Sequence, residues 1–436
     1  MAAAGLGFTA MLALIGLRMP VGLAMLLTGS AGYIYLANAS AFLNYMKSTP
    51  YFLFSNYTLS VIPLFILMGA FAERSGLATD LFKAASGFVG HLRGGLAMAV
   101  IGACTGFGAI CGSSVATTAT FGRAALPELR RYRYGDGLAT GTIAVGGTLG
   151  ILIPPSVILV VYAISTEQNI AKLFQAALIP GLLAALFYCL VIALVVRRDP
   201  AAGPAHPPVA ADARWRALVL VWPALVVALV VVGGIYGGIF TPTEGASVGA
   251  VSMFAIGVLR GSLPWREIKA SLLQTAETSA LIFAILLGAE VFNAFLALSQ
   301  LPTQAASFLG ETGLPPYAIL VALLAFYILL GAVMDELAMI LLTLPVFFPI
   351  VAVLDFGLPP DEVAIWFGIL VLIVVGIGLT APPIGLNVFV VSAIARDVPI
   401  TKTYRGVLPF IVADVIRLVL CVAFPAISLA LVRWLA

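Results

Sequence analysis

Oxygen-bearing side chains interrupt two long apolar stretches of this chain, and a break at a Pro-Pro pair follows each interruption. In the first half, GSS at 112–114 precedes GTLGILIPPS at 147–156; in the second half, Asp335 precedes GIGLTAPPIG at 376–385. Hydroxyls, carboxylates and the carbonyls freed by a broken helix are the oxygen ligands that a hard cation such as sodium prefers. Because two prolines in series remove helical donors and clash with the preceding turn, both stretches must break there.

Each interruption, placed opposite the break that follows it, predicts a cation site. Broken helices at membrane depth survive only where protein or a cavity satisfies their backbone groups, and in paired halves they mark transporter sites. The alternative is that small residues simply let helices pack closely, but the repetition of the whole pattern favours a site. The candidate cation ligands are Gly112, Ser113, Ser114, Gly147, Thr148 and Pro154 in the first half and Gly331, Met334, Asp335, Gly378, Thr380 and Pro382 in the second.

Three further polar residues are candidate contacts for an anionic substrate. The half-helix N-termini at the breaks present free amides and positive dipole ends, which suit a carboxylate. Ser156 and Asn387 follow the two Pro-Pro pairs, and Arg123 follows the first interruption. For Arg123 a second interpretation, a cytoplasmic anchor of the positive-inside type, is favoured.

Asp335 is the strongest single candidate, because a carboxylate inside an apolar stretch is expensive and indicates function. The same residue also suits a helix N-cap at the interruption, and the two roles are compatible. Asp414 and Arg417 lie three residues apart in another apolar run, which is the spacing of an ion pair within one helix. We interpret that pair as structural.

The composition establishes the class of protein. The chain is 62% hydrophobic and 9% charged over 436 residues, with a mean hydropathy of +1.13, whereas a soluble domain is about 25% charged. This predicts an all-α polytopic membrane protein, and a net charge of +3 spread over short loops does not suggest a nucleic-acid partner. The four cysteines and two histidines lack metal-ligand spacing, and the nucleotide loop G-x-x-x-x-G-K-[ST] is absent from the sequence. We therefore expect no resident metal centre, no ATP-driven pump and no catalytic residues.

The elements that must position these residues are transmembrane helices. Two stretches, 94–122 and 317–353, are apolar but interrupted near their middles, and they predict helical hairpins that enter and leave on one side. The Pro-Pro pairs predict broken helices at 137–165 and 364–394. Other apolar runs of about the spanning length of 17–25 residues are 21–37, 52–72, 173–197, 217–238, 272–298 and 407–433, with shorter candidates at 5–17 and 244–260.

Loop charges predict that the two halves are inverted relative to each other. The loops flanking the first hairpin carry seven basic residues, whereas those flanking the second, 299–316 and 354–362, carry acidic residues and no basic ones. Since basic loops stay cytoplasmic, the first hairpin should open to the cytoplasm and the second to the outside. We predict a first repeat at 5–197, a cytoplasmic linker at 198–215 and a second repeat at 216–436.

Several motifs, in order, resemble the large membrane subunit of the tripartite ATP-independent periplasmic (TRAP) transporters, the dicarboxylate-transport M type. They are GAICGSSVATTAT from 108, GILIPPS from 150, TPTEGASVGA from 241, GAVMDELAMILLTLPVFFPI from 331 and GIGLTAPPIGLNVFV from 376. The resemblance implies a sodium-coupled secondary transporter of the bacterial inner membrane, with sodium as the coupling ion and no cofactor. It also implies an elevator in which both hairpins and both broken helices carry the substrate past a scaffold.

The expected partners follow from the same resemblance. A periplasmic substrate-binding protein would deliver an organic acid, such as a C4-dicarboxylate, sialic acid or a similar carboxylate, and a separate small four-helix membrane subunit would complete the complex. Two alternatives stay open. One is a carrier or antiporter that needs no binding protein, coupled to sodium or, through Asp335, to protons; the other is an intramembrane enzyme, which the lack of a triad, metal motif or nucleotide loop disfavours.

Overall fold

Helices account for all the regular structure in the part of the chain that the computed structural model describes, residues 2–301, 303–304 and 314–435. Within these residues, seven helices are long and apolar enough to cross a membrane, or eight if the bent pair α8 and α9 counts as one span. Helices satisfy their own backbone hydrogen bonds, which is why so apolar a chain adopts them in lipid. The predicted all-α polytopic fold is confirmed.

The first half contains several separate helices, a hairpin and a broken helix. In order these are α1 (Ala2–Gly16), α2 (Val21–Leu36), α3 (Ala39–Phe54), the 3-10 turn η1 (Tyr57–Ser60), α4 (Val61–Arg74), α5 (Leu77–Val89), the hairpin α6 (Gly95–Cys111) and α7 (Ser114–Arg131), the broken helix α8 (Asp136–Leu152) and α9 (Val157–Ser165), and α10 (Ile170–Arg198). The bend between α8 and α9 is 45°. Both predicted features of this half are therefore present at the predicted places.

The second half repeats this order. It contains the turn η2 (Pro200–Ala202), α11 (Ala211–Tyr236), α12 (Pro242–Leu259), α13 (Trp265–Leu298), the hairpin α15 (Pro316–Gly331) and α16 (Glu336–Ala352), the broken helix α17 (Pro360–Gly378) and α18 (Leu386–Ile394), α19 (Ile400–Ala423) and α20 (Ala426–Trp434). The acidic residue Glu311 of the predicted outer loop lies outside the described residues. The repeat boundaries themselves stay a prediction.

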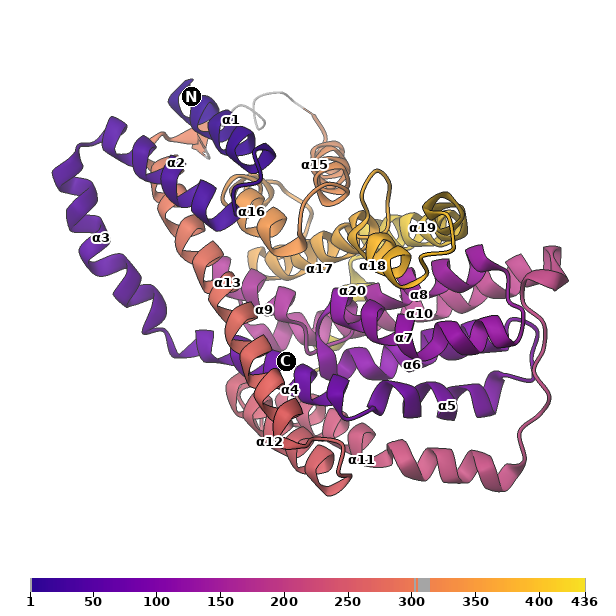
Figure 1. The fold of residues 1–436 in the computed structure, drawn as a ribbon. Coiled ribbons are helices and arrows are strands. Elements are labelled where there is room, and N and C mark those ends of the chain that lie inside the picture. The colour runs from indigo at the N-terminus through magenta and orange to yellow at the C-terminus, as the bar shows by residue number, and fades with distance from the viewer. Residues whose placement is uncertain (1, 302, 305–313, 436) are drawn as a thin grey trace.

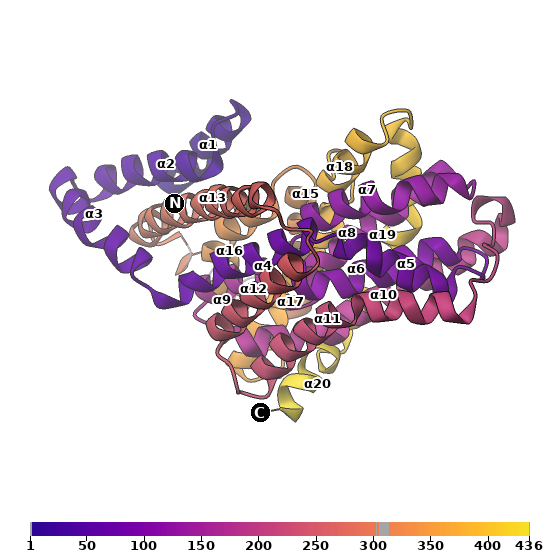
Figure 2. The same cartoon turned by 60° about the horizontal axis from the view of Figure 1, so that its bottom comes forward.

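Helices of the two halves cross-pack in equivalent pairs, α2 with α13 and α4 with α12 (Figures 1 and 2). The first pair packs backbone to backbone: a Cβ atom on Gly29 would lie 2.7 Å from the Cα of Phe292, and Gly22 of α2 faces Gly288 of α13. Small residues permit such close approach in membranes. These four helices form a frame, which we call the scaffold.

The hairpins and broken helices form a second group, with α17 at its centre. Every residue of α17 from Val363 to Gly378 is buried, because α8, α10, α15, α16 and α19 surround it. This explains why that segment is apolar on all sides rather than on one face. We call this group, with α10 and α19, the core.

Three sequence predictions about spans need correction. The predicted span 52–72 is not one helix, because α3 ends at Phe54 and the chain turns through η1 before α4. α3 itself extends over residues that lie between two predicted spans; Asn38 caps it by accepting a hydrogen bond from the Ala41 amide at 2.7 Å. It runs along the edge of the molecule, where the Tyr45 hydroxyl donates to the Glu290 carbonyl of α13 at 3.4 Å (Figures 1 and 2). The predicted span 407–433 is two helices, since Pro425 cannot donate to the preceding turn.

The linker between the halves is tied to the two ends of the first hairpin. The Gly94 amide donates to the Gly203 carbonyl at 2.8 Å, and the Gly135 amide donates to the Ala202 carbonyl at 2.9 Å. On the same side, Arg130 of α7 donates to Asp397 at 2.7 Å and holds the pKa of that carboxyl below its usual value. The linker is thus part of the fold around the hairpin and not a free tether.

Candidate ion and substrate site

The tip of the first hairpin lies directly on the break of the first broken helix. Gly112 ends α6 with a φ of +64°, a left-handed conformation that glycine adopts without strain, and Ser113 is the N-cap of α7. A Cβ atom on Gly112 would lie 2.9 Å from the Pro155 carbonyl oxygen, and one on Gly150 would lie 2.6 Å from the Ser113 carbonyl oxygen. Backbone meets backbone here, and we call this contact the first junction.

The residues predicted to face this tip are displaced by part of a helical turn. Gly150 faces the tip, whereas Gly147, three residues earlier on the same face of α8, packs against Thr118 of α7. The Thr148 hydroxyl points elsewhere, toward the Tyr188 hydroxyl of α10 at 3.1 Å. The structure therefore brings the predicted Gly112 and Ser113 together with Gly150 and the Pro-Pro pair, but not with Thr148.

Asn387, which follows the second Pro-Pro pair, crosses from the second half to the first hairpin. Its amide donates to the Ser114 hydroxyl at 2.7 Å and to the Ala144 carbonyl of α8 at 3.0 Å, and the Ser114 hydroxyl donates back to the Asn387 amide oxygen at 3.1 Å. Both side chains are fully buried. This cluster ties α18, α7 and α8 together at the middle of the core.

Two of the buried hydroxyls that have no hydrogen-bond partner among the described residues lie in the first hairpin and the first break. They belong to Thr118, which faces Gly147, and to Ser156, the predicted substrate contact after the first Pro-Pro pair. A buried hydroxyl without a partner is unfavourable by about 1–3 kcal/mol, so it indicates a water, an ion or a ligand group. Both oxygens are available as acceptors.

The second junction has the same construction as the first. A Cβ atom on Gly378, at the end of α17, would lie 2.6 Å from the Gly331 carbonyl carbon at the end of α15. The Ile384 amide, just past the second Pro-Pro pair, donates to the Ala332 carbonyl of the hairpin at 3.2 Å. The predicted pairing of Gly331 with Gly378 is therefore present in the structure.

The other predicted residues of the second half surround this junction with different roles. Asp335 is the N-cap of α16, where its carboxylate accepts hydrogen bonds from the Leu337 and Ala338 amides at 3.2 and 3.3 Å, and its side chain is exposed. Thr380 is buried and its hydroxyl donates to the Ile377 carbonyl at 3.0 Å. Met334 is half-buried, and Pro382 is exposed.

Sequence reasoning missed Glu336, the next residue after Asp335. Its side chain is only 8% exposed, and its Oε2 atom has no hydrogen-bond partner in the described part of the chain. A buried carboxylate in an apolar stretch indicates function as strongly as Asp335 does. The sequence signal for Glu336 is that it is the second of two adjacent acidic residues in an apolar stretch.

Arg123 does not reach either junction in this structure. Its guanidinium donates to the Glu73 carboxylate of α4 at 2.9 Å, so it joins the core hairpin to the scaffold. A polar crevice of about 330 Å³ lies beside this pair. A second cavity, of about 80 Å³, also borders Glu73 and reaches Ser113 at the first tip, with Gln274 and Thr278 of α13 on its far wall. We call these two cavities, which both border Glu73, the cleft between scaffold and core.

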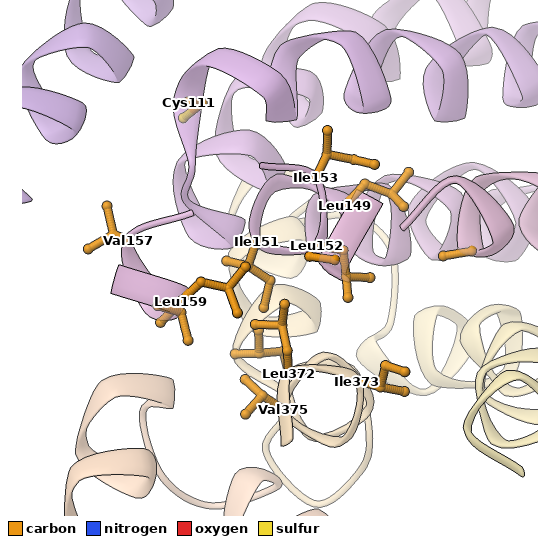
Figure 3. Packing of buried hydrophobic residues seen from close by; sticks show 14 of the residues in the cluster. Cys111, Leu149, Ile151, Leu152, Ile153, Val157, Leu159, Leu372, Ile373 and Val375 are labelled. Atoms are coloured by element: carbon orange, nitrogen blue, oxygen red, sulfur yellow. The ribbon is translucent and has the colours of Figure 1, made fainter. Parts of the chain in front are cut away.

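An apolar frame holds the first break in place. Figure 3 shows Ile151 and Leu159, on either side of the break, directed toward Leu372 and Val375 of α17. All four side chains are buried. The polar backbone of the break is thus held by close packing on α17 on one side and by the hairpin tip on the other.

Comparison with known proteins agrees with this fold and these motifs. Residues 8–427 match the family model described as the Tripartite ATP-independent periplasmic transporter, DctM component. The chain belongs to this family. As a TRAP large permease, it is a multi-pass protein of the inner membrane and part of a transporter that depends on a substrate-binding protein. The resemblance found in the sequence is confirmed.

Individual TRAP permeases and one solved structure are similar over most of their length. The C4-dicarboxylate TRAP transporter large permease protein DctM of Pseudomonas aeruginosa is 39% identical over 87% of this chain and 87% of its own. The sialic acid TRAP transporter large permease protein SiaM of Vibrio cholerae is 29% identical over 96% of each. The crystal structure of the Alcanivorax borkumensis YdaH transporter matches 91% of each chain with a TM-score of 0.65 and 17% identity, which shows a shared fold.

Proposed function

We propose that this chain is the permease subunit of a sodium-coupled, binding-protein-dependent secondary transporter that imports organic acids by an elevator mechanism. The observation that carries the proposal is the pair of junctions. In each half, a hairpin tip contacts a Pro-Pro-broken helix through glycines, so that backbone carbonyls converge without intervening side chains. Two equivalent sets of carbonyl and hydroxyl oxygens suit a hard monovalent cation better than a metal that needs nitrogen or sulfur ligands.

The first junction offers the carbonyls of Ser113 and Pro155 together with nearby hydroxyls. The second offers the backbone around Gly331, Gly378 and Thr380. At the second junction the carbonyls come from the C-terminal ends of α15 and α17, which carry the negative end of the helix dipole and attract a cation. At the first junction Ser113 is the N-cap of α7 and its carbonyl also accepts from Thr117, so the support for a cation there is geometric.

The cleft between scaffold and core is the proposed place for the substrate. Ser113 at the first tip lines one of its cavities, together with Gln274 and Thr278 of α13 as neutral hydrogen-bonding groups, and Arg123 lines the other. A carboxylate in this cleft would compete with Glu73 for the Arg123 guanidinium, because both are anions seeking the same donors. Since the Pseudomonas aeruginosa permease is named for C4-dicarboxylates, a C4-dicarboxylate is the first substrate to test.

The proposed elevator is supported by how the two groups of helices meet. The scaffold helices α2 and α13 contact each other closely through glycines, whereas α4 meets the first hairpin at two partly polar cavities and at one close contact, Gly69 against the Cys111 carbonyl. A polar, partly open interface permits sliding more readily than an interlocked apolar one. A separate small four-helix subunit and a periplasmic binding protein are the proposed partners.

One observation favours a second candidate, a proton-coupled carrier that needs no binding protein. Glu336 is a buried carboxylate with an unpartnered oxygen, and carboxylates inside membrane segments are the groups that proton relays use. In that case uptake would follow the proton gradient, and Glu336→Gln would abolish it.

The test is uptake of labelled succinate into proteoliposomes that contain this chain and its small subunit. Four conditions combine an inward sodium gradient or none with the binding protein or none. The proposal expects uptake only when both are present. Uptake at the same rate with and without the sodium gradient would contradict the proposal, as would equal uptake without the binding protein. Uptake that depends on a proton gradient instead would favour the second candidate.

A further inference from the structure

A chain of buried polar groups connects the first broken helix to the last helix of the core. The Tyr188 hydroxyl of α10 donates to the Asp414 carboxylate of α19 at 2.7 Å, and the Thr148 hydroxyl of α8 lies 3.1 Å from the Tyr188 hydroxyl. Arg417 forms an ion pair with Asp414 at 2.8 Å and donates to the Pro180 carbonyl of α10 at 3.2 Å. All four side chains of this polar network are buried.

The number of protons available fixes the direction of these hydrogen bonds. Tyr188 has one hydroxyl proton, and the short bond to Asp414 uses it. The Thr148 hydroxyl donates to the Val145 carbonyl at 2.7 Å and shares the same proton with the Tyr188 oxygen at 3.1 Å. With Tyr188 in place, the Thr148 side chain is held between two acceptors; without it, Val145 alone takes the proton.

The two charges of this polar network, Asp414 and Arg417, are stable only as a pair. A lone arginine or aspartate in an apolar core is strongly unfavourable, whereas a close ion pair with further hydrogen bonds is tolerated. Arg417 neutralises Asp414, and Asp414 in turn keeps Tyr188 oriented as a donor. The spacing predicted a structural pair within one helix, and the structure adds the contacts to α10 and, through Tyr188, to the ion-site helix.

Thr148 lies in the most glycine-rich part of α8, the sequence GGTLG from 146 to 150. Because glycine supplies no side chain, this segment is held by close contacts of its backbone with Cys104, Thr118 and Ser113 and by the side chains of Thr148 and Leu149. The same segment carries Gly150, which contacts the first tip. The Thr148 hydroxyl is therefore one of the side-chain contacts that position the backbone of the first junction.

We propose that Tyr188, Asp414 and Arg417 are positioning residues for cation binding at the first junction, acting through Thr148. They hold the glycine-rich segment of α8 at the distance from the hairpin tip that a bound sodium ion requires. The inference rests on the proposed sodium coupling of this transporter. It assigns a role in ion affinity to groups that touch neither the ion nor the substrate.

Tyr188→Phe is the decisive variant, because it removes one hydroxyl and keeps the ring. Tyr162→Phe is the matched control: Tyr162 is equally buried in the core, and its hydroxyl donates to the Ala364 carbonyl of α17 at 2.7 Å, without a link to Thr148. Tyr162→Phe loses one buried hydrogen bond, whereas Tyr188→Phe loses the bond to Asp414 and the contact with Thr148. The readout is the sodium concentration that gives half-maximal uptake, measured together with the maximal rate and the thermal unfolding midpoint.

The expected result is a rise of about 3- to 10-fold in the half-maximal sodium concentration for Tyr188→Phe, which is the loss of one buried hydrogen bond expressed as affinity. The maximal rate should stay near that of the wild type, and Tyr162→Phe should keep the wild-type sodium dependence. An unchanged sodium dependence in a folded Tyr188→Phe protein would overturn the proposal. So would equal changes in the two variants, because a merely structural bond would affect both alike.

A double variant, Asp414→Asn with Arg417→Met, removes both charges of the pair and tests whether sodium affinity recovers. Asp414→Asn leaves Arg417 unpaired and should weaken sodium binding and lower the unfolding midpoint. Adding Arg417→Met removes the stranded charge, while the asparagine still accepts from Tyr188, so the double variant should recover sodium affinity toward the wild type. If Asp414→Asn does not fold, the Tyr188→Phe comparison decides alone. Wild-type uptake without any sodium dependence would instead refute the proposed function, an outcome visible before any variant is made.

Discussion

Gly378→Ala tests the second junction most sharply, because the new methyl group meets backbone on the opposite side. It would lie 2.6 Å from the Gly331 carbonyl carbon and 2.7 Å from the Gly331 Cα, whereas carbon atoms in contact prefer about 3.5–4.0 Å. Neither helix end can yield by rotating a side chain, so the hairpin tip must move by about 1 Å. Overpacking of this kind costs about 1–3 kcal/mol.

That energy should appear as lost ion affinity. If the tip moves to accommodate the methyl group, the carbonyls of the second junction separate, and 1–3 kcal/mol corresponds to a rise of about 5- to 150-fold in the half-maximal sodium concentration for uptake. The assay is succinate uptake into proteoliposomes over a range of sodium concentrations at constant ionic strength. The unfolding midpoint of the purified protein should fall as well.

Gly376→Ala is the matched control on the same helix. Its methyl group would meet only the Thr148 Cβ at 3.7 Å, an ordinary contact, and alanine favours a helix over glycine by about 0.5–1 kcal/mol. This variant should transport like the wild type and unfold at the same temperature or higher. The reasoning is refuted if a folded Gly378→Ala protein keeps the sodium dependence of the wild type, or if the control loses as much affinity.

Three further variants test the rest of the site. Asn387→Ala should lower the stability of the core by about 1–3 kcal/mol, because it leaves Ser114 without its partner, and an unchanged thermal unfolding midpoint would contradict the cross-connection. Glu336→Gln should fold and transport like the wild type, because glutamine keeps the size and shape of the side chain and breaks no ion pair among the described residues; loss of uptake would show that the charge or the proton of Glu336 is used. Arg123→Ala should weaken the apparent affinity for the acid with little effect on stability, since an exposed ion pair contributes about 0–1 kcal/mol, and equal weakening by Arg131→Ala on the same helix would exclude a specific role.

The sequence predicted the parts of this site that depend on residues that break helices. Both hairpins and both breaks are where the paired prolines and the polar interruptions placed them, because a Pro-Pro pair breaks a helix whatever surrounds it. The pairing of Gly331 with Gly378 was likewise predictable from the order of the motifs. The family followed from the same motifs.

The predictions that were wrong concern which residue of a helix faces the site, and this depends on how the helix is rotated about its axis. Each residue turns the helix by about 100°, so the choice between Thr148 and Gly150 as the residue facing the first tip depends on packing against α10 and α17 that no local pattern records. The same holds for Asp335 and Glu336: adjacent carboxylates point in different directions, and only the cap conformation determines which one is buried. The span 52–72 failed because hydropathy averages over a short polar turn.

The most direct test of the account is whether the organic acid drives sodium across the membrane. Proteoliposomes containing this chain, its small subunit and the binding protein would receive labelled succinate and radioactive sodium outside, at equal sodium concentration on both sides. The account predicts that succinate together with the binding protein causes sodium to accumulate inside, and that Gly378→Ala reduces this accumulation while Gly376→Ala does not. Succinate uptake without accompanying sodium movement would contradict the central claim.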